Sequence, residues 1–160
     1  MKRRYIVDAF LVLAVVVCGL TGEDLLKVET SVTPLRLSRG EEGKVVLKIS
    51  LKPGIVVSPL PSFIVEFDPN AELVFPKNFF TAMDLKIAAV EDTGRERLDL
   101  KKPVEVPFTV SPKAARGVHT VTGRIRYFAI SGSGGWCYKS AAKFSATYST
   151  RLTTVEKKRP

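Results

Sequence analysis

The sequence predicts an all-β protein, an immunoglobulin-like antiparallel β-sandwich. Three observations predict it: short stretches of alternating apolar and polar residues, turn signals about every 8–15 residues, and no convincing helical window between residues 25 and 150. About seven short strands of this kind are typical of such a sandwich, although the disulfide and tryptophan hallmark of antibody domains is absent. The chain has 160 residues, 45% of them hydrophobic and 26% charged, which suits one globular domain.

The N-terminal segment has the pattern of an export signal. A positive start, Met1–Arg4, precedes an unbroken apolar run of twelve residues, Ala9–Leu20. That run is shorter than the roughly 20 residues that a membrane-spanning helix needs. We therefore assign residues 1–22 to a signal peptide, 23–152 to the β-sandwich domain and 153–160 to a basic tail.

An exported, periplasmic or extracytoplasmic location follows from this assignment. Cleavage after Gly19 or Gly22 would place a small residue at the cut site, although neither matches the Ala-x-Ala form well. An uncleaved anchor, or lipid attachment at Cys18, stays open, and either would be the chain's contact with a membrane. Cleavage at either glycine would leave Cys137 as the remaining thiol in an oxidising compartment.

The chain is basic, with a formal net charge of +9. Its lysines and arginines are scattered along the predicted strands, and they cluster only at Lys157–Arg159. This distribution favours solvated strand faces and a soluble tail over a nucleic-acid surface. We therefore expect protein partners and no nucleic acid.

The first half of the domain reads as strands and turns. Residues 45–52 alternate with period two and end at Pro53-Gly54. Residues 55–76 hold apolar clusters broken by prolines, which predicts short or edge strands. Residues 78–99 are the least regular and predict a loop or ragged hairpin over one end of the sheet.

The second half holds three clearer strands. Val104, Val106, Phe108 and Val110 alternate with polar residues or proline over 104–111. Residues 117–127 and 142–149 also alternate, and they flank the glycine-rich turn 131–135. This pattern predicts a hairpin with Cys137 near its tip.

Cys137 is the residue at which chemistry is most plausible. It lies between Trp136 and Tyr138, with Lys139 adjacent and Arg126 on the partner strand. Nearby cations and exposure favour the reactive thiolate, whereas a buried cysteine is inert, and the sequence leaves both readings open.

Neither a metal site nor a cofactor site is predicted. His119 is the sole histidine, and one cysteine with one histidine falls short of the three or four ligands that zinc takes. The turn 131–135 resembles a phosphate-binding loop only in composition, because no Lys-Ser/Thr follows it.

The segment Phe128 to Tyr138 resembles the active hairpin of a known family. Phe128-Ala129-Ile130-Ser131, five residues ending in Gly135-Trp136, and then Cys137-Tyr138 match the pattern of the N-terminal immunoglobulin-like domain of DsbD thiol:disulfide interchange proteins. That pattern is an aromatic residue, two residues, Cys, five residues containing Gly-aromatic, Cys and Tyr. The resemblance extends more loosely over residues 25–150.

The resemblance implies redox partners but also a departure. It implies an exported domain that passes electrons from a membrane carrier to thioredoxin-like or cytochrome c biogenesis proteins, with Cys137 as nucleophile and Phe128, Gly135, Trp136 and Tyr138 around it. Ser131 stands where the family has its first cysteine, so an internal dithiol cycle cannot run.

Two functions follow as hypotheses. The first is engagement of thiol–disulfide partners through Cys137, without self-sufficient disulfide reductase activity. The alternative is a non-redox, immunoglobulin-like protein-binding module in which Cys137 is structural.

Overall fold

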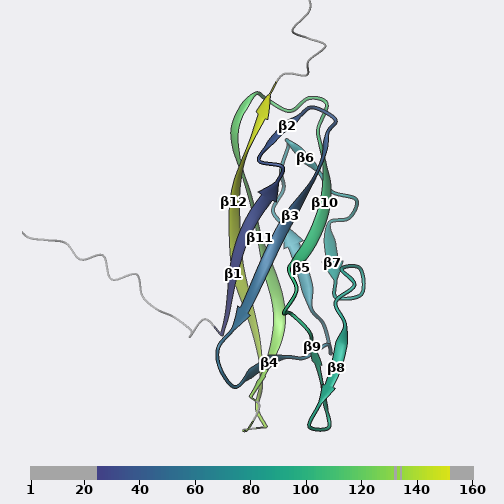
Figure 1. Ribbon diagram of the computed structural model, residues 1–160, viewed down its shortest axis with the longest axis vertical. Coiled ribbons are helices and arrows are strands. Elements are labelled where there is room, and N and C mark those ends of the chain that lie inside the picture. Colours follow the sequence, from purple (N-terminus) through teal and green to yellow (C-terminus); the bar gives the residue numbers. More distant parts are fainter. Residues whose placement is uncertain (1–24, 132, 134, 152–160) are drawn as a thin grey trace, which may run out of the picture.

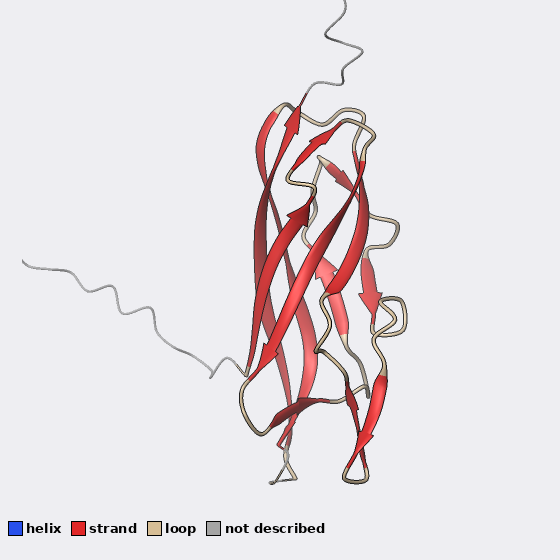
Figure 2. Cartoon of the chain, viewed as in Figure 1, coloured by secondary structure: helices blue, strands red, loops and turns tan. Residues whose placement is uncertain are grey.

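A computed structural model describes residues 25–131, 133 and 135–151, so the predicted signal peptide, Cys18 and the basic tail lie outside the described residues. The described residues form strands joined by turns, without a helix (Figure 2). The strands, in chain order, are β1 (Leu26–Thr33), β2 (Arg36–Ser38), β3 (Glu42–Leu51), β4 (Ile55–Val57), β5 (Ile64–Phe67), β6 (Leu73–Val74), β7 (Phe79–Thr81), β8 (Ala89–Asp92), β9 (Arg95–Leu98), β10 (Val104–Val110), β11 (Gly117–Ser131) and β12 (Cys137–Arg151).

The strands form the predicted immunoglobulin-like sandwich. One sheet has the order β1-β3-β10-β6, and the other has the order β2-β12-β11-β5-β7 with β4 also paired to β11 (Figure 1). Strands β8 and β9 form a separate hairpin. All strand pairs are antiparallel except β2 with β12, which run parallel. In the part of the chain that the structure describes, no helix is long and apolar enough to cross a membrane.

The alternating residues of the sequence line the inner faces of the two sheets. Val45 and Leu47 of β3 are fully buried, as are Val121 and Ile125 of β11. The predicted strands 45–52 and 104–111 correspond to β3 and β10 with small shifts at their ends. The predicted stop at Pro53-Gly54 is confirmed: Gly54 has a φ of 79°, and the Ile55 N–H donates to the Lys52 carbonyl at 3.1 Å. This is the proline-glycine chemistry of a type II turn.

Residues 78–99 are more ordered than the sequence suggests. They hold β7, a tight turn and the β8–β9 hairpin, which projects from one end of the sandwich (Figure 1). Asp84 fixes the turn, because its carboxylate binds the Lys77 ammonium and accepts the Thr81 N–H at 3.0 Å. These hydrogen bonds, that of Lys77 foremost, lower the pKa of Asp84 to about 2.

Gly123 makes room for the aromatic core. It lies opposite Phe144 of β12 and Phe67 of β5, whose ring centroids are 5.4 Å apart. A Cβ at this position would lie 2.3 Å from the Glu66 carbonyl oxygen and 2.5 Å from Phe144 Cζ. Backbone of the neighbouring strand cannot yield as a flexible side chain would, so the position requires glycine.

Gly123→Ala is therefore expected to destabilise the fold by about 1–3 kcal/mol, the usual range for an overpacked core. Urea unfolding followed by circular dichroism measures this value. Ser145→Ala on the exposed face of β12 is the control and should change stability by less than about 0.5 kcal/mol. Equal stability of the two variants would contradict this packing.

Tyr148 gives the fold a pH dependence. Its side chain is 2% exposed, and burial raises its pKa to about 12. Unfolded tyrosine titrates near pH 10, at about its usual pKa. The stability that comes from holding the phenol neutral is therefore complete below about pH 10 and is lost as the pH rises toward about 12.

Tyr148→Phe should remove this component. Urea midpoints measured from pH 9 to pH 12 should fall more steeply for the natural protein than for the variant. Parallel curves would show that the Tyr148 phenol ionises equally easily in the folded and unfolded chains.

Candidate functional site

The predicted hairpin is confirmed, and it is longer than the sequence indicated. β11 pairs with β12 without interruption from Gly117 opposite Thr150 to Ile130 opposite Cys137. One further bond, from the Ser131 N–H to the Trp136 carbonyl at 3.2 Å, continues the ladder. We call residues 128–131 and 135–139 the hairpin tip; it extends beyond the ends of β1 and β3 (Figure 1).

The tip has two faces, because successive side chains of a strand point to opposite sides. Residues directly opposite each other in the ladder share a face. Cys137 therefore shares a face with Ile130, whereas Trp136 and Tyr138 share the other face with Ser131 and Ala129. We call these the thiol face and the aromatic face.

The thiol face places sulfur beside apolar side chains. Cys137 is exposed and forms no disulfide with the described residues. Ile130 is paired across the sheet with Cys137 on one side and with Val56 of β4 on the other, so the three residues form one row, or rung, of the sheet. In the next rung, Phe128 lies opposite Lys139. The half-buried Val56, Phe128 and Ile130 thus give this face an apolar character next to the thiol.

The aromatic face exposes two rings. Trp136 is 42% exposed and Tyr138 61%, although their partners in the ladder, Ser131 and Ala129, are buried. Further along β12 the residues of this face, such as Phe144, enter the core. The rings are exposed because the hairpin continues past the opposing strands β1 and β3 (Figure 1).

Gly135 shapes the turn. Its φ of 64° lies in the left-handed region, which glycine adopts without a steric penalty, and no atom lies within 4 Å of a Cβ built there. Gly135 therefore serves the backbone conformation of the turn. Residues 132 and 134 of the predicted turn lie outside the described residues.

Ser131 and Cys137 do not face each other. Ser131 is opposite Trp136 in the ladder and is 9% exposed, whereas Cys137 is opposite Ile130 and exposed. The two side chains therefore project to opposite faces of the hairpin. Trp136 and Tyr138 likewise project away from the thiol, while Phe128 lies on the thiol's own face.

Arg126, which the sequence suggested as a cation near the thiol, is held elsewhere. Its guanidinium forms an ion pair with Glu66 of β5, and Arg124 Nε binds the same carboxylate at 2.8 Å. Lys139 is closer along the chain to Cys137, and it lies on the same face, two residues further along β12.

His119 has a structural environment. Its Nε2 lies 2.8 Å from the Ala115 carbonyl and 2.9 Å from Thr150 Oγ1, at the end of the hairpin opposite to the tip. Across residues 25–131, 133 and 135–151, no group of three or more His, Cys, Asp or Glu residues is arranged to hold a metal ion.

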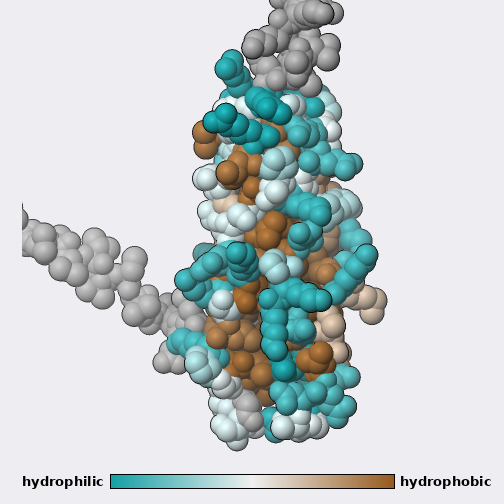
Figure 3. All heavy atoms as spheres, in the orientation of Figure 1, coloured by the Kyte–Doolittle hydropathy of each residue, from teal (hydrophilic) through white to brown (hydrophobic). Residues whose placement is uncertain are grey.

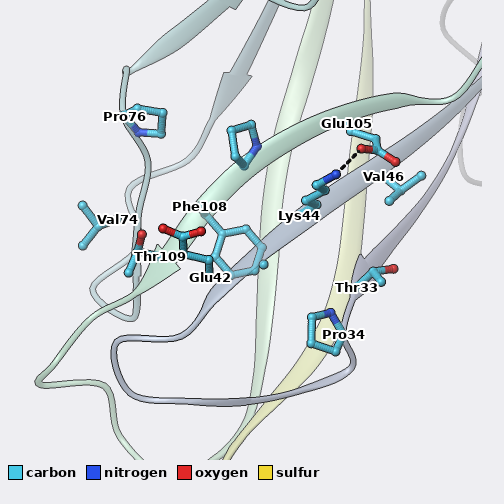
Figure 4. A pocket seen from close by; sticks show the side chains of 12 residues that line it. Thr33, Pro34, Glu42, Lys44, Val46, Val74, Pro76, Glu105, Phe108 and Thr109 are labelled. Carbon is cyan, nitrogen blue, oxygen red and sulfur yellow. Dashed lines mark hydrogen bonds and ion pairs between the residues drawn. The ribbon is translucent and has the colours of Figure 1, made fainter.

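A shallow groove lies on the outer face of β3 and β10, and none of the predicted site residues lines it (Figure 4). It encloses about 680 Å³, and the ion pair between Lys44 Nζ and Glu105 Oε2, at 2.6 Å, crosses its wall. Thr33, Pro34, Glu42, Gly43, Lys44, Val46, Val74, Pro76, Glu105, Pro107, Phe108 and Thr109 line it. The pairing of β3 with β1 and β10, and of β10 with β6, brings these residues together, so the sequence carries no signal for the groove.

No protein-family model and no curated protein matches the chain. Among solved structures, it is similar to the cohesin module of a family 33 glycoside hydrolase from Clostridium perfringens ATCC13124, at 13% identity and a TM-score of 0.41, covering 80% of this chain and 96% of that chain. The seventh ScaB type I cohesin of Pseudobacteroides cellulosolvens gives 11% identity, 79% and 94% coverage and a TM-score of 0.44. Murine CRIg gives 10% identity, 81% and 98% coverage and a TM-score of 0.35. These similarities concern the fold alone, and none of these three structures is a DsbD domain.

The exposure of Cys137 predicts how the folded protein reacts with an alkylating reagent. Iodoacetamide should modify Cys137 in the folded chain, and peptide mass should locate the label. Ala129→Cys in a Cys137→Ser background is a matched control, because Ala129 is fully buried and a thiol there should react only after unfolding. Protection of Cys137 until the chain unfolds would contradict the described exposure.

Proposed function

We propose that this chain is a protein-binding β-sandwich module that contacts its partner through the hairpin tip. The observation that carries the proposal is the exposure of Trp136 and Tyr138 on one face of a hairpin end that projects past the core. Cys137 and the apolar side chains of Val56 and Ile130 extend the same surface onto the other face.

Physical chemistry favours this surface for protein contact. Tryptophan and tyrosine are enriched among the residues that contribute most binding energy, because they bury large apolar areas and also offer a hydrogen-bonding group. The continuous ladder beneath the tip holds its backbone in place before binding, which reduces the entropy lost on association. Hydrophobic atoms also gather over β4 and the nearby ends of β1 and β3 (Figure 3).

A narrower function is that the partner is a thiol–disulfide protein of an exported electron relay, as the DsbD-like hairpin implies. The exposed, unbridged thiol of Cys137 favours it. In this reaction the Cys137 thiolate attacks a disulfide of the partner, a mixed disulfide forms, and the partner's second sulfur leaves as a thiolate. Because position 131 is serine, resolution needs an external thiol, and the chain is not a complete disulfide reductase.

Site-specific photo-cross-linking tests the proposed surface. A benzophenone amino acid at position 136 or 138 should give a light-dependent protein adduct in the producing cells. The same probe at Val118, which is 77% exposed at the other end of the hairpin, is the matched control and should not. Equal adducts at 118 and 136, or none at 136, would overturn the proposal.

Cys137→Ser separates the two functions. Plain protein binding predicts that the adduct at position 136 persists in this variant. A thiol–disulfide function predicts a partner linked to Cys137 that a reducing agent releases and that the variant fails to capture.

A further inference from the structure

Four cations gather on the outer face of the six-stranded sheet, on the same side of the hairpin as the thiol. Arg124 of β11 lies opposite Lys143 of β12, and Arg126 lies two residues further along β11, closer to the tip. Lys139 completes the group opposite Phe128. We call these four residues the cation ladder. In the sequence they are scattered, and only the pairing of β11 with β12 brings them together.

The cation ladder is only partly neutralised. Like charges directly opposite each other, as Arg124 and Lys143 are, destabilise a sheet. Glu66 offsets this repulsion by binding both arginines. Within the part of the chain that the structure describes, Lys139 and Lys143 have no ion pair, and Asp68 is engaged by the Thr122 hydroxyl at 2.7 Å.

A hollow lies at the end of the ladder that is further from the hairpin tip. Thr122, Arg124, Lys143 and Ser145 line it together with Asp68. The Ser145 hydroxyl, the Lys143 ammonium and the remaining N–H groups of Arg124 can donate hydrogen bonds to an anion. The Thr122 hydroxyl already donates to Asp68, whose charge limits the anion's approach from one side. Glu66 already occupies the adjacent position with a carboxylate, which shows the ligand chemistry that these guanidinium groups accept.

We propose that the cation ladder recognises acidic side chains on the protein that docks at the hairpin tip, a segment running along β11 and β12 with carboxylates beside Lys139 and Lys143. This inference rests on the proposed function and names the chemistry of its partner. The two lysines are four residues apart, roughly 13 Å along a strand, so the acids of an extended segment match them at the same spacing. The surface becomes apolar at Phe128, opposite Lys139, and at Ile130 beyond it, where the segment's apolar residues would lie.

Charge complementarity of this kind acts on association and orientation more than on total affinity. The carboxylate of Glu66 already bridges the two arginines, which leaves the two lysines, unpaired within the described residues, as the charges that a partner's carboxylates would contact. The simpler explanation is a solvated basic face that only keeps the chain soluble. The two explanations differ in whether position matters or only net charge.

Binding of fluorescein-labelled poly-L-glutamate to the full chain, followed by anisotropy, separates them. Lys139→Gln/Lys143→Gln should weaken binding roughly 5- to 10-fold, because it removes two exposed charge pairs that contribute about 0.5–0.7 kcal/mol each. Lys48→Gln/Lys102→Gln removes the same charge from exposed positions elsewhere and should weaken it by less than about 2-fold. Circular dichroism should show both variants folded.

Two results would overturn the inference. One is equal weakening by the two variants. The other is no binding of polyglutamate, whether or not phosphatidylglycerol vesicles or a DNA oligonucleotide bind the ladder. The photo-cross-linked adduct at position 136 distinguishes failure of the cation-ladder inference from failure of the proposed function. An adduct with unchanged yield in Lys139→Gln/Lys143→Gln would leave the tip as the contact surface and remove the ladder from it.

Discussion

The uninterrupted pairing of β11 with β12 is the constraint on which the rest of the structure depends. It places Phe144 over Gly123 in the core and carries the backbone past the opposing sheet as far as Ser131 and Trp136. Because each rung fixes the face of the next, the same ladder that builds the core decides which side chains the tip exposes. Packing and the proposed contact surface are therefore two ends of one element.

The sequence predicted the strands wherever one face is buried. Alternation identified β3, β10 and the two strands of the long hairpin, because a half-buried strand shows period two in its residues. For residues 78–99 it predicted only a loop or a ragged hairpin and no strand bounds, because the residues of the β8–β9 hairpin are mostly exposed and alternate little. It also could not show that Asp84 binds Lys77 and Thr81 to fix the turn before this hairpin, since that depends on local geometry.

The candidate site was predicted in position but not in arrangement. The composition around Cys137 placed a thiol and three aromatic residues at a hairpin tip. The register then separates Cys137 from Trp136 and Tyr138, and it also separates Cys137 from Ser131. A one-residue change in register would reverse these faces, and the glycine-rich turn gives no sequence signal for the choice. For the same reason the cation ladder and the ion pair of Arg126 with Glu66 emerge only from the paired strands.

The division of the tip into a thiol face and an aromatic face is tested most directly by adding a second cysteine. Ile130 lies opposite Cys137, and the neighbouring pair, Ser131 and Trp136, is hydrogen-bonded. Because the two kinds of pair alternate along an antiparallel ladder, Ile130 and Cys137 form a non-hydrogen-bonded pair, whose Cα separation of about 4.5 Å suits a disulfide. Titration of free thiols after air oxidation should find Ile130→Cys bridged to Cys137 and Ser131→Cys with both thiols free. A quantitative 131–137 disulfide would contradict the register and restore a dithiol geometry to this hairpin.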